Sequence, residues 1–172
     1  MPAIHRCELP QEALLCKYQR GGAYADCYVT EVAQQVSHAA FVEAFYTTWL
    51  FKVERLLLAW LVAKPATDTQ ARQLAAGAID TFAAWNVEAR AADQLLLCDF
   101  QGRTRSWLMV TPIPGHAAAG TRLYFGSAVV PALQGGTAKP RLGPVFHLLL
   151  GFHKLYSRAL LSAAKSRLAR LG

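Results

Sequence analysis

Residues 143–172 read GPVFHLLLGFHKLYSRALLSAAKSRLARLG, and this stretch carries the clearest structural signal in the chain. At about 100° per residue its apolar side chains fall in one stripe, which consists of Leu142, Leu149, Tyr156 and Leu160. The opposite face is polar and basic, and consists of His147, Lys154, Arg158 and Lys165. Pro144 suits the first turn of a helix. We therefore expect one long amphipathic helix that packs its apolar face on a core.

The two histidines of this stretch fall on different faces of the expected helix. His147 lies on the polar face, where we expect it in solvent, whereas His153 lies within the apolar stripe. A histidine in such a place is either a core residue bonded to one neighbouring carbonyl or hydroxyl, or a group that orients a ligand or transfers a proton in a cavity. Tyr156, one turn later, has the same two interpretations, as a core aromatic or as a hydroxyl in that cavity.

Upstream of this helix, the sequence predicts an early strand followed by helices. Tyr24–Val32 (YADCYVTEV) is rich in aromatic and β-branched residues and reads as a strand. Ser37 can cap a helical region that runs to Lys64, with a break near residues 47–48, before Pro65 ends it. A short capped helix then begins at Thr67 or Asp68 and reaches about Ala76.

A block of strands follows the helices. Residues 85–100 give two short strands around a polar turn at 91–93, residues 98–113 turn at Gln101-Gly102 into another strand, and residues 120–133 supply a further strand that Pro131 ends. Sequential hairpins favour an antiparallel sheet, and segregated helices favour an α+β fold. We expect a single two-layer domain over residues 1–172.

Length and composition narrow the class of protein. The chain has 172 residues, of which 53% are hydrophobic and 17% charged, so it can bury a sizeable core. No apolar run reaches the roughly 20 residues of a membrane span. The surplus of apolar residues indicates a large core, a lined cavity or an apolar interface. No secretory leader is visible, and the four cysteines lack metal-ligand spacing, so we expect reduced thiols, a cytoplasmic location and no metal or cofactor.

The charge is unevenly distributed along the chain. Eleven acidic and eight basic residues occur up to Asp99, whereas ten basic and no acidic residues follow it. Such asymmetry marks either a surface for nucleic acid or membrane, or simply one basic helix face. No helix-turn-helix, zinc module or RNA-binding strand motif appears, so we do not expect a nucleic-acid partner. A membrane-surface role for the last helix stays a minor alternative.

The segment DFQGRTRSW, residues 99–107, is the densest polar group of the strand block. A two-residue turn at Gln101-Gly102 would pair Phe100 with Arg103 and put Asp99 and Arg105 on opposite faces. A three-residue loop would instead place them on one face. Arg105 is then either an inward group for a carboxylate or phosphate, oriented by Asp99, or part of an exposed ion pair.

The other charged residues and the known sequence motifs do not indicate a catalytic or binding site. Asp26 and the pair Glu54-Arg55 read as solvated or cap-like charges rather than sites. No nucleophile elbow, phosphate-binding loop, dinucleotide fingerprint or zinc-protease motif occurs.

The order of elements and the ending RLYFGSAVVP…FHKLYSRALLSAAKSRL resemble the START/Bet v 1 helix-grip (SRPBCC) superfamily, and in particular a small group of bacterial proteins within it. The resemblance covers most of the chain by layout, with FH before a hydrophobic helix as its most specific element. It implies a curved antiparallel sheet wrapped around the long C-terminal helix, with a cavity for an apolar or amphipathic molecule. The polar residues of that group's strand block are replaced here by DFQGRTRSW.

These observations lead to one main expectation and two alternatives. The main one is binding of a small apolar or amphipathic ligand in a cavity lined by a set of five residues: His153, Tyr156, Arg105, Trp107 and Tyr124. The first alternative is a cyclase, dehydratase or hydrolase that uses His153 as general base with Tyr156 or Arg105 polarising a carbonyl. The second is a membrane-surface protein. Ligand identity and oligomeric state stay open.

Overall fold

The computed structural model describes residues 3–53, 66–114, 120–130 and 144–170, with the backbone alone for 144–154. Strands from these ranges form one antiparallel sheet in the order β1-β2-β7-β6-β5-β4-β3. Their bounds are β1 His5–Arg6, β2 Tyr24–Val32, β3 Thr81–Phe82, β4 Trp85–Ala91, β5 Gln94–Asp99, β6 Thr104–Pro112 and β7 Thr121–Val129. The four hairpin-linked strands β4 to β7 confirm the predicted antiparallel block.

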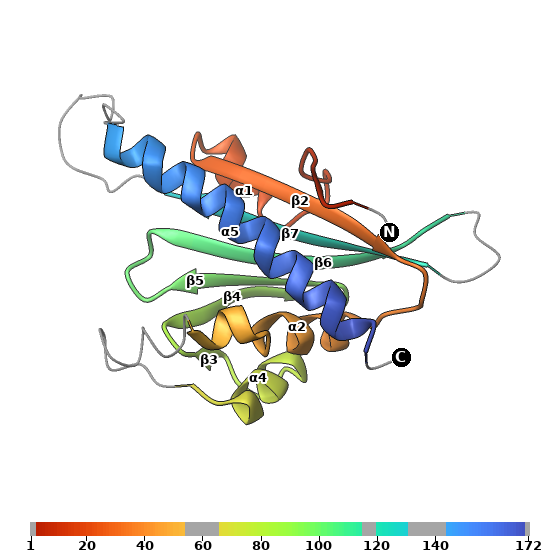
Figure 1. The fold of residues 1–172 in the computed structure, drawn as a ribbon. Helices are drawn as coiled ribbons and strands as arrows, with labels where there is room; N and C mark the ends of the chain where they lie inside the picture. The colour runs from red at the N-terminus through yellow and green to blue at the C-terminus, as the bar shows by residue number, and fades with distance from the viewer. Residues whose placement is uncertain (1–2, 54–65, 115–119, 131–143, 171–172) are drawn as a thin grey trace.

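The helices are α1 Cys16–Arg20, α2 His38–Tyr46, α4 Asp68–Ala75 and α5 Pro144–Leu168, and residues 49–53 are helical as well. α5 crosses one face of the sheet diagonally, and α2 and α4 lie together beside its C-terminal half (Figure 1). We call the face under α5 the inner face and the opposite one the outer face. The chain thus has an α+β fold with a long C-terminal helix. Within the described ranges, no helix combines the length and apolarity that crossing a bilayer requires.

The helix boundaries follow from local hydrogen bonds that the sequence predicts. Ser37 Oγ accepts the N–H of Ala40 at 3.1 Å and begins α2. Thr67 and Gln70 form a capping box, in which each side chain accepts the other's backbone N–H. The expected break at residues 47–48 is present, because Thr47 Oγ1 bonds back to the Glu43 carbonyl at 2.6 Å before the chain becomes helical again at 49.

The main core lies between the inner face and the helices. Its aromatic residues pack mostly edge-on or tilted against one another, with one stacked pair, Phe51 and Phe82, and comprise Phe41, Phe45, Tyr46, Phe51, Phe82 and Phe125. From α5 the core receives Leu160, Leu161, Ala164 and Leu168. The predicted apolar stripe is confirmed at Leu160.

The prediction that Lys165 lies on the solvated face of α5 is wrong. Lys165 is half-buried, and its Nζ lies 3.1 Å from Thr30 Oγ1 on the inner face. The long side chain of Lys165 allows this, because it reaches along the edge of the core.

A second core covers the outer face, so the expected two-layer arrangement is incomplete. α1 and the residues before it pack Leu15 and Cys16 against Cys27, Trp107 and Met109. This close packing needs Gly126 in the middle of β7. A Cβ there would come within 2.9 Å of the Asp26 carbonyl oxygen, Leu15 Cδ2 and Trp107 Cε3. The absence of a side chain at residue 126 is therefore what lets the N-terminal segment lie against the sheet.

Candidate functional site

A cavity of about 220 Å³ lies between the inner face and α5. Its deep walls are apolar and buried, and are formed by Phe45, Phe51, Phe125 and Leu160. Its remaining boundary includes half-buried residues at one end of the sheet and on α5: Trp85, Thr104, Val129 and Tyr156. Because these residues have atoms in solvent, this end of the cavity forms its rim.

A row of buried polar side chains crosses the inner face beside this cavity. Asp26, Ser127 and Ser106 are directly opposite one another on β2, β7 and β6. Ser127 Oγ donates to Asp26 Oδ1 at 2.6 Å, and Ser106 Oγ lies 3.1 Å from the Tyr46 hydroxyl. All four residues are less than a tenth exposed. Buried polar groups in an aromatic core are held by such bonds, and here the bonds orient the two serines that line the cavity.

The burial of Asp26 corrects the sequence-based interpretation of this residue as a solvated charge. Asp26 is 2% exposed, because the alternation of β2 places it on the inner face between Tyr24 and Tyr28. The Tyr24 hydroxyl lies 3.4 Å from Asp26 Oδ2. Burial, followed by the negative charge of Asp26, raises the pKa of Tyr24 to about 12. Tyr24 therefore stays a neutral hydrogen-bond donor beside the carboxylate.

Two residues that line the cavity each carry a buried polar atom with no hydrogen-bond partner among the described residues. The two atoms are Ser157 Oγ, on a side chain with no exposed surface, and Trp85 Nε1. Both residues line the cavity, Ser157 from α5 and Trp85 from β4. A buried donor without a partner costs about 1–3 kcal/mol. The lining of the cavity thus combines apolar aromatic walls with a few polar side chains, two of which carry an unpartnered atom, and this combination is typical of ligand sites.

Of the residues predicted to bind a ligand, Tyr156 lies at the wall of this cavity, and its contact with a ligand stays a prediction. His153 belongs to α5, but its side chain lies outside the described residues, so its predicted role as ligand contact or general base stays a prediction.

The prediction that Trp107 and Tyr124 line this cavity is wrong. Both point to the outer face, where their ring centroids are 6.3 Å apart. Trp107 is fully buried, and its Nε1 donates to Gln94 Oε1 at 2.9 Å. The alternation of side chains along β6 and β7 sends them there, because Ser106 and Phe125, their sequence neighbours, occupy the inner face. Trp107 is therefore a core residue of the outer layer.

Arg105 borders the cavity, but its guanidinium does not enter it. Cys98 is opposite Arg105 in the hairpin, so the next residue, Asp99, lies on the opposite face of the sheet from Arg105. Asp99 instead accepts the backbone N–H groups of Arg103 and Thr104 at 2.7 and 3.1 Å. Of the two alternatives that the sequence left open, the structure has the one in which Asp99 and Arg105 are on opposite faces.

The partner of Arg105 is Glu88, which lies at a β-bulge of β4. Arg105 Nε is 2.7 Å from Glu88 Oε2 and 2.8 Å from the Tyr18 hydroxyl, and its guanidinium carbon stacks 4.5 Å from the Tyr18 ring centroid. Lys17 and the Tyr18 hydroxyl bond the other carboxylate oxygen. This cluster attaches α1 to β4 and β6, and its role is structural.

Acid should weaken this attachment. Burial acts to raise the pKa of Glu88, but hydrogen bonds from Lys17 and Tyr18, with the charge of Arg105, outweigh it and hold the pKa below its usual value. A carboxyl whose pKa is lowered by folding stabilises the fold above its unfolded pKa of about 4.5, and this contribution is lost as pH falls through the folded pKa. Glu88→Gln should lower the free energy of unfolding by about 1–2 kcal/mol near neutral pH, with the difference from the unmodified chain shrinking in acid. Urea unfolding across this pH range measures it, and a difference that does not change with pH would contradict the assignment.

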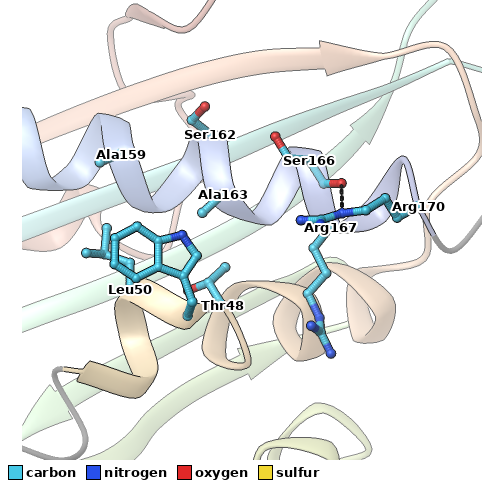
Figure 2. A pocket seen from close by; sticks show the side chains of 9 residues that line it. Thr48, Leu50, Ala159, Ser162, Ala163, Ser166, Arg167 and Arg170 are labelled. Atoms are coloured by element: carbon cyan, nitrogen blue, oxygen red, sulfur yellow. Dashed lines mark hydrogen bonds between the residues drawn. The ribbon is translucent and has the colours of Figure 1, made fainter.

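A larger and more open groove of about 780 Å³ runs along the outside of α5 (Figure 2). Its α5 side presents mainly small side chains, Ala159, Ser162 and Ala163, and ends at Arg167 and Arg170. Arg170 Nε donates to the Ser166 carbonyl within the helix at 3.2 Å. Phe45, Phe51 and Phe125 wall the cavity under α5 with buried aromatic side chains, whereas the aromatic side chain of the open groove, Trp49, is 70% exposed, so the cavity is the stronger candidate site.

The comparisons with other proteins give no relative: the chain matches no protein-family model, no curated protein and no solved structure. In the part of the chain that the structure describes, no three histidine, cysteine or acidic side chains gather as metal ligands would.

Proposed function

We propose that this chain is a cytoplasmic helix-grip protein of the START/Bet v 1 type, and that it binds a small amphipathic molecule under α5. The fold supports the proposal because a long C-terminal helix crosses the inner face of an antiparallel sheet. The free cysteines are consistent with the reducing compartment. The observation that carries the proposal is the cavity with the unpartnered Trp85 Nε1 and Ser157 Oγ.

The cavity limits the size and polarity of the ligand. A volume of about 220 Å³ corresponds to about seven water molecules, so the ligand is smaller than a typical drug. Phe45, Phe51 and Phe125 favour an apolar body. The indole N–H can only donate, and the serine hydroxyl donates as well as accepts. A carbonyl or hydroxyl oxygen on the ligand is an acceptor that suits either group.

The charges near the cavity favour a neutral ligand. Arg105 is the cationic residue that borders it among the described residues, and its guanidinium bonds Glu88 and Tyr18 on the outer face. The buried Asp26 bonds Ser127 at the cavity wall and would repel an anion. We therefore infer a ligand with an uncharged oxygen group, such as a ketone, an alcohol or a phenol, rather than a fatty acid.

Three size-matched probes test this chemistry: cyclohexanone, cyclohexanol and methylcyclohexane. Ligand-observed NMR titration should show the ketone and the alcohol binding about tenfold more tightly than the hydrocarbon, because each hydrogen bond contributes about 1 kcal/mol. Trp85→Phe keeps an aromatic ring at the cavity wall but is smaller and lacks the N–H, so it should reduce this preference severalfold. Native mass spectrometry after mild purification should also detect a co-purified small molecule.

A cavity-filling variant locates the binding. Ser157→Leu puts an isobutyl group into the cavity and should abolish binding of all three probes, whereas Ser162→Leu, on the exposed side of the same helix, should retain it. Binding that survives Ser157→Leu in a folded variant would place the ligand elsewhere. Failure of every probe and the absence of a co-purified molecule would contradict the proposal itself.

The other two functions have less support. An enzyme of the predicted type depends on His153, whose side chain is outside the described residues. A membrane-surface role needs free basic groups at the end of α5. Lys165 instead bonds Thr30, and Arg158, in the middle of α5, donates to the Ile4 carbonyl at 3.2 Å, so these two basic groups hold α5 to its own fold, whereas Arg170 is exposed.

A further inference from the structure

Two cysteines face each other across the first strand pair. The register of β1 and β2 pairs Arg6 with Tyr28, so Cys7 comes directly opposite Cys27. The Cys7 N–H donates to the Cys27 carbonyl at 3.0 Å, and the two Sγ atoms are 3.0 Å apart as free thiols. Residues directly opposite in an antiparallel pair have Cα atoms about 4.5–5.5 Å apart, which is within the range that a disulfide spans.

We propose that Cys7 and Cys27 form a redox-active dithiol, which closes to a disulfide when the protein meets a peroxide or a small-molecule disulfide. This modification site is on the outer side of β2 and is independent of the ligand cavity. Its action needs an exposed attacking thiol, a second thiol within reach and a path for the oxidant.

The path is a pocket of about 410 Å³ that both cysteines line, together with Arg6, Glu8 and Gln19. Cys7 is half-buried at this pocket, whereas Cys27 is 1% exposed. A molecule the size of hydrogen peroxide therefore reaches Cys7 first.

The greater exposure of Cys7 assigns the roles of the two thiols, and one further observation agrees with it, the hydrogen bond between them. This bond lowers the pKa of Cys7, because the Cys27 thiol can donate to the Cys7 thiolate, and together with burial it raises the pKa of Cys27. Since the thiolate is the nucleophile, Cys7 attacks the oxidant and Cys27 resolves the product.

The chemistry balances with peroxide as the oxidant. The Cys7 thiolate attacks one peroxide oxygen, the O–O bond breaks, and the products are Cys7 sulfenic acid and water once the leaving hydroxide is protonated. Cys27 sulfur then attacks Cys7 Sγ, the S–O bond breaks, and the disulfide and a second water form. The two thiols lose two electrons and two protons in total, and a dithiol reductant reverses the change.

The other two cysteines have different surroundings. Cys16 Sγ donates to the Pro10 carbonyl at 3.0 Å, and Cys98 Sγ lies 3.3 Å from the Asp99 carbonyl. Each thiol is thus bonded to a backbone oxygen rather than to another thiol. We therefore expect oxidation to be selective for the Cys7–Cys27 pair.

Peptide mapping by mass spectrometry tests the pair directly. The full chain is treated with hydrogen peroxide and, separately, with oxidised glutathione, and free thiols are then alkylated. We expect an intramolecular cross-link between Cys7 and Cys27, with a mass lower by two hydrogen atoms, that a dithiol reductant removes. Closing this short loop should raise Tm by roughly 5–10 °C.

Matched variants separate the pair from the other thiols. Cys7→Ser should abolish the cross-link and the Tm shift, and Cys27→Ala should do the same, whereas Cys98→Ser should keep both. Cys7→Ser changes a half-buried residue and should stay folded by circular dichroism, so it decides the test if Cys27→Ala does not fold. A cross-link that includes Cys16 or Cys98, a disulfide between two chains, or oxidation of Cys7 to sulfinic acid without a disulfide would overturn the proposal.

Discussion

Replacing Trp107 with alanine should lower the free energy of unfolding by about 3–5 kcal/mol and leave ligand binding unchanged. Trp107 is fully buried in the outer core, against α1 and the strand residues around it. Its removal leaves a void that the backbone of β6, paired on both sides, cannot close. The Nε1 hydrogen bond to Gln94 is lost too, but Gln94 Oε1 still accepts the Leu14 N–H at 2.9 Å. The expected loss of free energy of unfolding therefore comes mainly from the void.

Urea unfolding of Trp107→Ala measures this loss, and Trp49→Ala is its control. Trp49 is 70% exposed, so the same truncation there should change stability by only about 0.5 kcal/mol. Cyclohexanone should bind the folded Trp107→Ala protein as it binds the unmodified chain. If binding were lost while stability hardly changed, Trp107 would belong to the ligand site, as the sequence alone suggested.

Phe45→Ala should cost a similar 3–5 kcal/mol, but it should also change which ligands bind. Phe45 is 1% exposed and lies 4.8 Å from the Phe125 ring and 5.2 Å from the Tyr46 ring, centroid to centroid. It is a wall of the cavity, so its removal joins the new void to the existing space. Larger amphipathic molecules, such as 4-tert-butylcyclohexanone, should then bind more tightly than cyclohexanone.

The matched control is Phe41→Ala. Phe41 is fully buried 6.1 Å from Phe45 in the same core, yet it does not border the cavity. It should lose as much stability without the shift in ligand size, as judged by the same NMR titrations. Because total stability is about 5–15 kcal/mol, Phe45→Leu provides a milder second variant if Phe45→Ala does not fold. An equal shift in ligand size for Phe41→Ala and Phe45→Ala would contradict the cavity assignment.

Local patterns in the sequence predict most of the elements. The bounds of β2, the cap at Ser37, the capping box at Thr67 and the long helix α5 all depend on neighbouring residues, and all are confirmed. The N-terminal layer was missed because α1 has only five residues and no helical period. A signal was nevertheless present in the sequence: β5 and β6 contain runs of consecutive apolar residues, Leu95–Leu97 and Trp107–Val110, which are typical of strands covered on both faces.

The candidate site was harder to predict, because it depends on contacts between distant residues. Alternation shows that Ser106 and Trp107 face opposite ways, but not which face carries α5. Arg105 pairs with Glu88, 17 residues away and at a bulge, whereas the sequence offered the nearer Asp99. Burial of Asp26 likewise depends on its bond to Ser127, 101 residues later. A polar residue within an apolar strand is thus a signal for a site, but its partner comes from the tertiary fold.

The polar row formed by Asp26, Ser127 and Ser106 also has a consequence for how the chain folds. If β2 paired with β7 one residue out of register, Asp26 would turn to the outer face and meet Trp107 and Leu15 instead of Ser127. A buried carboxylate without its partner costs several kcal/mol, a substantial share of the stability of a domain. The row therefore makes a misaligned sheet unfavourable. Ser106 and Ser127, which line the cavity, thus also favour the strand register on which the cavity depends.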